Sequence, residues 1–194
     1  MKAYGADLLG FVFAESRRRI TPENAELIAR EITGVGKVGI FVNSPLQEVQ
    51  EIANRCRLDF VQLHGEEPPD YCRALKIPVI KAFRVQDEGF DPAEMDAYGV
   101  DLVLLDTYCP GNYGGTGVTF DWRRTAESCR QLKTPFIVAG GLTPYNVAEA
   151  VSMLLPSGVD VSGGVETAGQ KDVEKIGRFI QAARSAQGGQ QYAG

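Results

Sequence analysis

Short apolar runs alternate along this chain with segments whose apolar residues recur at helical spacing. The runs carry hydrophobic side chains at successive positions, which is typical of parallel strands buried on both faces. They recur at intervals of about 20 to 30 residues, the length of a strand-helix unit. Seven strands are therefore predicted, at residues 8–13, 38–42, 60–63, 79–83, 102–105, 136–138 and 159–161.

Helix start signals follow each of these runs. Thr21 is a candidate N-cap, with Pro22 at the first helical position, where its missing N–H group costs nothing. Prolines also mark helix starts near Pro45, Pro68 and Pro144. The predicted helices are 22–32, those beginning near 45 and 68, a weak helix at 93–98, those beginning at 121 and 144, and 172–184.

A repeated strand-helix unit favours a parallel sheet with helices outside, either a closed barrel or a doubly wound open sheet. Two glycine turns follow the last two strands and favour the barrel, because in such barrels the final loops form a phosphate site from backbone amides. The candidate phosphate-binding residues are Gly140, Gly141, Gly163 and Gly164. We expect one domain spanning 1–194, with a loose tail at 188–194.

The segment 102–122 carries the strongest candidate for chemistry. An apolar strand ends in Asp106, and a glycine-rich loop then leads to Trp122. The carboxyl ends of parallel strands are where ligands bind, so Asp106 is placed like a catalytic acid or base. The alternative for Asp106 is an ordinary turn or helix-capping aspartate.

Composition excludes several classes of partner. The formal net charge is −5 and the pI is about 5.0, and no basic run is long enough to neutralise a phosphate backbone, which argues against nucleic acid. The cluster at 17–19 suits a small anion instead. No apolar run approaches the roughly 20 residues that span a bilayer, and the N-terminus lacks a signal-peptide pattern, so a cytoplasmic location is expected.

The cysteines and the single histidine do not form a metal-binding pattern. Cys56, Cys72 and Cys129 are scattered through predicted helices, where packing as reduced thiols is expected. Cys109 lies in the loop after Asp106 and is the one cysteine placed to contact a ligand. No zinc site is predicted.

Several motifs occur in the order that one enzyme family shows. They are Gly10-Phe-Val-Phe13, Ser16-Arg-Arg-Arg-Ile20, Gly39-Ile-Phe-Val-Asn43, Val61-Gln-Leu-His-Gly-Glu66, Leu104-Leu-Asp-Thr107, Gly114 to Trp122, Ala139 to Pro144 and Val159 to Glu166 with Lys171-Asp172. On these motifs the chain resembles phosphoribosylanthranilate isomerase, a (βα)8-barrel enzyme of tryptophan biosynthesis.

The resemblance implies an Amadori rearrangement of N-(5′-phosphoribosyl)anthranilate with no metal or organic cofactor. It makes Asp106 the general acid and Arg18 the partner of the anthranilate carboxylate. Asp160 and Ser162 are expected at the same mouth as substrate-binding residues. His64 is a further substrate-binding candidate. It is also a candidate substitute for the general base of the family.

The chain departs from the family pattern at its front. The family has a strand carrying Lys-x-Cys-Gly and then a helix before Gly-Ala-Asp, which here stands at 5–7. The family's general base is that cysteine, and none of the four cysteines matches it. The sequence therefore predicts seven units of the barrel, with unpaired edges at 8–13 and 159–161 that leave the protein marginally stable and prone to aggregation.

Three interpretations remain open. The first is an isomerase whose recorded chain starts late and whose activity is impaired. The second is a non-catalytic phosphate-ligand binder. The third is one part of a split enzyme completed by a strand-helix fragment. The oligomeric state is also open, and a homo-oligomer is one alternative.

Overall fold

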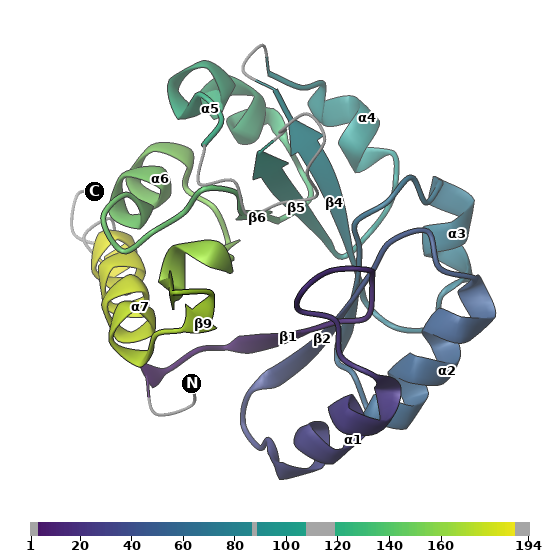
Figure 1. The fold of residues 1–194 in the computed structure, drawn as a ribbon. Helices are drawn as coiled ribbons and strands as arrows, with labels where there is room; N and C mark the ends of the chain where they lie inside the picture. Colours follow the sequence, from purple (N-terminus) through teal and green to yellow (C-terminus); the bar gives the residue numbers. More distant parts are fainter. Residues whose placement is uncertain (1–3, 87–88, 108–118, 189–194) are drawn as a thin grey trace.

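Seven parallel strands form a curled sheet with helices on its outer face (Figure 1). The computed structural model describes residues 4–86, 89–107 and 119–188. The strands lie side by side in chain order, and each hydrogen-bonds in parallel to the next, as the repeated strand-helix pattern predicts. They are β1 (Leu8–Val12), β2 (Gly36–Phe41), β3 (Phe60–Leu63), β4 (Val79–Val85), β5 (Leu102–Thr107), β6 (Phe136–Val138) and β7 (Gly158–Val159).

The helices and a small hairpin complete the fold. The helices are α1 (Pro22–Glu31), α2 (Leu46–Cys56), α3 (Pro69–Ala74), α4 (Pro92–Asp96), α5 (Trp122–Gln131), α6 (Val147–Leu154) and α7 (Val173–Gly188). After β7 come a 3-10 turn, η2 (Gly163–Val165), and the hairpin of β8 (Glu166–Thr167) and β9 (Gln170–Lys171), which the sequence did not predict. Helix α7 ends at Gly188, the first residue of the predicted tail, and 189–194 lie outside the described part, so the loose tail stays a prediction.

Local caps explain most of the helix starts. The Thr21 side chain accepts from the Asn24 N–H, and the Asp121 carboxylate accepts from the first turn of α5. The predicted start at Pro144 is wrong by three residues. The Asn146 side chain accepts from the Thr143 N–H and holds residues 143–146 as a turn before α6 begins.

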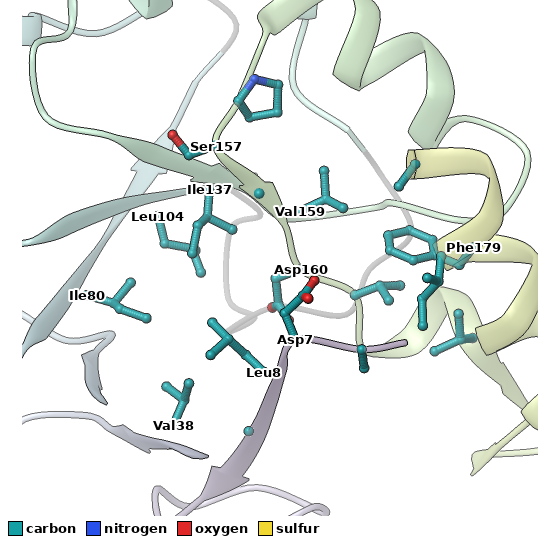
Figure 2. Close-up of a pocket in the computed structure, with 18 of the residues that line it drawn as sticks. Asp7, Leu8, Val38, Ile80, Leu104, Ile137, Ser157, Val159, Asp160 and Phe179 are labelled. Atoms are coloured by element: carbon teal, nitrogen blue, oxygen red, sulfur yellow. The ribbon is translucent and has the colours of Figure 1, made fainter. Parts of the chain in front are cut away.

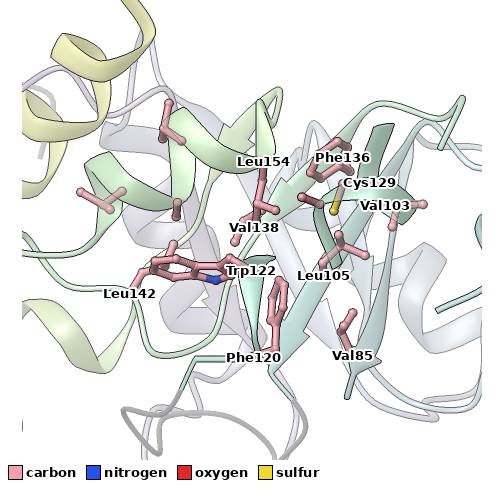
Figure 3. Close-up of a cluster of buried hydrophobic side chains, with 14 of the residues drawn as sticks. Val85, Val103, Leu105, Phe120, Trp122, Cys129, Phe136, Val138, Leu142 and Leu154 are labelled. Carbon is pink, nitrogen blue, oxygen red and sulfur yellow. The ribbon is translucent and has the colours of Figure 1, made fainter. Parts of the chain in front are cut away.

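The apolar side chains pack on both faces of the sheet. Outside it, Trp122 and Leu142 lie with strand residues such as Val138 and Leu105 (Figure 3). A smaller cluster fills the inner side of the curl, with Val38, Ile80, Ala82, Leu104, Ile137 and Ala139. This double burial explains why the strands read as continuous apolar runs.

The curled sheet has two open edges. In the described part of the chain, β1 pairs along its length only with β2, and β7 pairs only with β6. A bridge from Val12 to Arg19 covers the end of the β1 edge. At its start, Arg184 of α7 donates to the Gly5 carbonyl and pairs with Asp7. Among residues 4–86, 89–107 and 119–188, the predicted unpaired edges are thus confirmed, apart from the bridge at Val12.

The open β1 edge is expected to promote self-association. Leu8 is 38% exposed there, and a lysine on an exposed edge opposes strand pairing between molecules. We expect Leu8→Lys to slow aggregation at 37 °C, measured by light scattering. Leu27→Lys on α1, where Leu27 is 61% exposed, is the control and should change little. Equal aggregation of Leu8→Lys and the parent chain would contradict a role for this edge.

Candidate active site

The carboxyl ends of the strands carry polar side chains that converge on one mouth. Asp106 stands near the end of β5, His64 follows β3, and Asp160 follows β7. Parallel strands bring these positions together, since all their carboxyl ends lie at the same end of a curled sheet. Arg18 lies in the loop after β1 and hydrogen-bonds to Glu166, which brings it to the same mouth.

Asp106 and His64 are directly paired. His64 Nε2 lies 3.1 Å from Asp106 Oδ2, and the Asp106 residue is 6% exposed. Gln62 Nε2 lies 3.1 Å from His64 Nδ1. Because an amide nitrogen donates, Nδ1 accepts, and the imidazole proton on Nε2 points to Asp106. The structure thus brings together two of the residues that sequence reasoning selected.

The absence of a side chain at Gly140 leaves room for the Asp106 carboxylate. Gly140 has φ +79°, and a Cβ there would lie 2.7 Å from Asp106 Oδ1 and 2.3 Å from Thr107 Oγ1. Asp106 Oδ1 itself accepts from the Thr107 N–H at 2.9 Å. A side chain at position 140 would therefore displace the carboxylate as well as strain the backbone.

Asp160 is accessible from the mouth but surrounded by protein groups. Loss of solvation raises the pKa of its carboxyl, and the Asp106 carboxylate adds to that rise, while His64 and Lys171 oppose it. Two acidic groups and one imidazole therefore share this mouth.

Asp160→Asn is expected to raise stability slightly at neutral pH, since Asp160 is exposed and water screens much of the effect. An aspartate titrates near pH 3.9 when unfolded, and the raised pKa of Asp160 means that the folded protein loses stability as pH rises through that pKa. The melting temperature of Asp160→Asn should exceed that of the parent at pH 7 and converge with it near pH 3. Asp70→Asn, on a side chain 94% exposed, is the control. A gain that does not depend on pH would contradict this explanation.

Glu166 binds three basic side chains, and the sequence analysis did not single it out. Its carboxylate accepts from Arg18 Nε at 2.8 Å and Arg17 Nη2 at 2.6 Å, and it pairs with Lys171 at 3.3 Å. Burial opposes ionisation, but the hydrogen bonds from Arg18 and Lys171 lower the pKa of Glu166. Arg18 Nη2 also lies 2.8 Å from Glu166 Oε1, so two nitrogens of this guanidinium face the same carboxylate.

The two glycine turns are in direct contact. A Cβ on Gly164 would lie 1.8 Å from the Leu142 carbonyl oxygen, so only glycine fits there without movement. Lys171 Nζ donates to the Ser162 carbonyl at 2.8 Å and lies 3.3 Å from its hydroxyl. The structure thus places the turns of Gly140–Gly141 and Gly163–Gly164 together, with a lysine beside them.

A cavity of about 440 Å³ lies inside the curl. Figure 2 shows Ile80, Leu104 and Ile137 on one wall, Phe179 of α7 on another, and Asp160 beside them. Asp106, His64 and Arg18 do not line this cavity. It runs between the open edges of β1 and β7 and reaches the polar mouth at Asp160 and Lys171.

The described cysteines are remote from this mouth. Cys56, Cys72 and Cys129 are free and buried in helices outside the sheet. Burial raises the pKa of the Cys56 and Cys72 thiols, and that of Cys129 to about 11. Cys109 lies outside the described residues.

Within residues 4–86, 89–107 and 119–188, no three potential metal-binding side chains cluster, and no helix is long and apolar enough to cross a membrane.

Comparison with known proteins identifies the family. The sequence model of N-(5′-phosphoribosyl)anthranilate isomerase matches residues 1–182. The enzyme of that name from Geobacter metallireducens is 52% identical over 185 residues, covering 93% of this chain and 90% of the relative. That from Moorella thermoacetica is 48% identical over 94% of this chain and 82% of the relative.

The chain belongs to the phosphoribosylanthranilate isomerase family.

Solved structures agree with this family assignment. The isomerase from Thermus thermophilus superposes with a TM-score of 0.84 at 36% identity, over 95% of this chain and 90% of that one. The isomerase from Thermotoga maritima gives 0.81 at 38% identity, over 95% and 91%. A third isomerase, with a TM-score of 0.77, was solved with reduced 1-(o-carboxyphenylamino)-1-deoxyribulose 5-phosphate; it is 36% identical, over 95% and 90%. The predicted barrel-type fold and the predicted isomerase family are confirmed.

Proposed function

We propose that the mouth binds N-(5′-phosphoribosyl)anthranilate and that Asp106 supplies the acid of its Amadori rearrangement. The observation that carries the proposal is the buried Asp106–His64 pair in a chain of this isomerase family. Arg18, whose side chain is 27% exposed and paired with Glu166 at this mouth, is the cation that we assign to the anthranilate carboxylate. The two glycine turns and Lys171 suit the phosphate.

The reaction needs one acid and one base. Asp106, in its protonated form, gives a proton to the ribose ring oxygen as the C1–O bond breaks and a Schiff base forms. A base then removes the C2 proton, which leaves an enolamine that tautomerises to the ketone. Return of the proton from the base to Asp106 resets both groups. Asp106 is positioned for the first step by Thr107 N–H and His64.

None of the described cysteines is placed to act as the base. Cys56, Cys72 and Cys129 are buried away from the mouth. His64 Nδ1 accepts from Gln62 and its Nε2 faces Asp106, so neither ring nitrogen offers a free lone pair to the substrate. We therefore propose that this chain turns over slowly. Asp160, Ser162 and His64 act in substrate binding in this proposal.

The lack of a free base among the described residues also favours a second candidate, a phosphate-ligand binder without turnover. Its mouth would keep Arg18 and the glycine turns and lack only the base. The open edges of β1 and β7 favour a variant in which a strand-helix fragment completes the barrel.

Two measurements on the purified chain separate these candidates. Loss of substrate fluorescence, with enzyme in excess over phosphoribosylanthranilate, reports turnover. Calorimetric titration with reduced 1-(o-carboxyphenylamino)-1-deoxyribulose 5-phosphate reports binding. Slow turnover with binding supports the isomerase, binding alone supports the second candidate, and a folded protein that does neither contradicts both.

A further inference from the structure

A buried ion pair lies next to the His64 loop and is not used in the proposed chemistry. Lys81, on β4, and Glu67, four residues after β3, have side chains that are each 2% exposed. Lys81 Nζ lies 3.1 Å from Glu67 Oε2. A lysine on a buried strand is costly unless each of its protons finds an acceptor.

Both charged groups are fully hydrogen-bonded. Lys81 Nζ donates to Gly65 O at 2.7 Å and Leu63 O at 3.3 Å, in addition to Glu67. Glu67 Oε1 accepts from the Asn43 N–H at 2.7 Å, and Oε2 accepts from the Gly65 N–H at 3.0 Å. The pair thereby ties together the carboxyl ends of β2 and β3 and the strand β4.

These bonds hold the backbone on both sides of His64. Leu63 and Gly65, its two neighbours, both bond to the pair. His64 N–H itself donates to Phe41 O at 2.9 Å. Gly65 is also pressed against Asn43, since a Cβ there would lie 2.3 Å from Asn43 Oδ1. Little freedom is left to His64 except rotation of its ring.

Stability alone is a weak reason for such a pair. Replacing a buried ion pair by apolar side chains of similar size is often neutral or stabilising, whereas removing one partner is strongly destabilising. What apolar side chains cannot replace is the set of bonds to Leu63, Gly65 and Asn43. These are the bonds that determine where His64 stands.

We propose that Lys81 and Glu67 are positioning residues that set the His64 ring against Asp106. This inference rests on the proposed function, in which His64 orients the acid. The pair acts through the backbone of residues 63–65 and does not touch substrate. Its loss leaves Asp106 in place but without a fixed partner.

The single histidine of the chain gives a direct readout. In the ¹⁵N NMR spectrum of labelled histidine, the parent should show two well-separated ring nitrogens, since Nε2 carries the proton. Glu67→Gln is expected to move these signals toward an average, because the ring is no longer held in one tautomer. The single-turnover rate should fall about tenfold or more, with a smaller change in the affinity for the reduced product analogue.

Two further variants separate positioning from stability. Lys81→Met combined with Glu67→Met should fold at least as stably as Glu67→Gln, yet show the same averaged histidine signals. Val49→Ala, at a fully buried site on α2, should lower stability and leave the signals unchanged. Parent-like histidine signals in both Glu67 variants would overturn the proposal. Absence of analogue binding by the parent would instead refute the proposed function, because the NMR readout needs no ligand.

Discussion

Substitution of Asp106 by asparagine is expected to lower the single-turnover rate by about 10²-fold or more. Asparagine keeps the shape of the side chain but cannot transfer a proton to the ribose ring oxygen, and a positioned general acid contributes about 10² to 10⁴ in rate. The measurement is loss of substrate fluorescence with enzyme in excess. Binding of the product analogue should change little, because Asp106 is not among the proposed phosphate or carboxylate contacts.

The matched control is Asp101→Asn, just before the opposite end of the same strand. Asp101 accepts from the Val79 N–H at 2.9 Å, away from the mouth. Its replacement should leave the turnover rate within about twofold of the parent. If Asp106→Asn retained the parent rate, Asp106 would not be the acid.

Gly164→Ala is expected to damage both the fold and ligand binding. The new Cβ would lie 1.8 Å from the Leu142 carbonyl oxygen and 2.9 Å from its carbon, so one glycine turn must move. Overpacking of this kind costs about 1 to 3 kcal/mol of unfolding free energy. Displacement of the turn should cost a similar amount of binding free energy, which weakens analogue binding by about tenfold or more. Urea unfolding and calorimetry measure the two effects.

Gly158→Ala is the control for this substitution. A Cβ at Gly158, on β7, would lie 3.6 Å from the nearest atom of Ile137, which is ordinary contact. Stability and affinity should both stay close to those of the parent. Unchanged analogue binding by a folded Gly164→Ala protein would show that the glycine turns do not form the phosphate site.

Local sequence signals predicted most of the sheet, because strand burial and helix caps are encoded within a few residues. The run 136–138 and the Thr21–Pro22 cap are examples that the structure reproduces. The prediction for 159–161 was too long. The observed strand ends at Val159, and the chain then turns into η2 and the β8–β9 hairpin, whose shape depends on Arg17, Arg18 and Lys171 gathering around Glu166.

The site was predictable where it follows strand ends and unpredictable where it depends on distant pairing. Asp106 and His64 stand at the carboxyl ends of β5 and β3, two strands of one parallel sheet, so their approach could be expected in outline. Glu67 and Lys81 were missed, since their partnership crosses from one strand end to another. The available signal was a single lysine inside the otherwise apolar run 79–83, which requires a buried partner.

Titration with reduced 1-(o-carboxyphenylamino)-1-deoxyribulose 5-phosphate tests the central claim most directly, because binding does not require a general base. The parent and Asp106→Asn proteins are predicted to bind it saturably with similar affinity, and Gly164→Ala is predicted to bind it at least about tenfold more weakly. No saturable binding by the folded parent, or equal binding by all three proteins, would contradict the assignment of this mouth as the isomerase site.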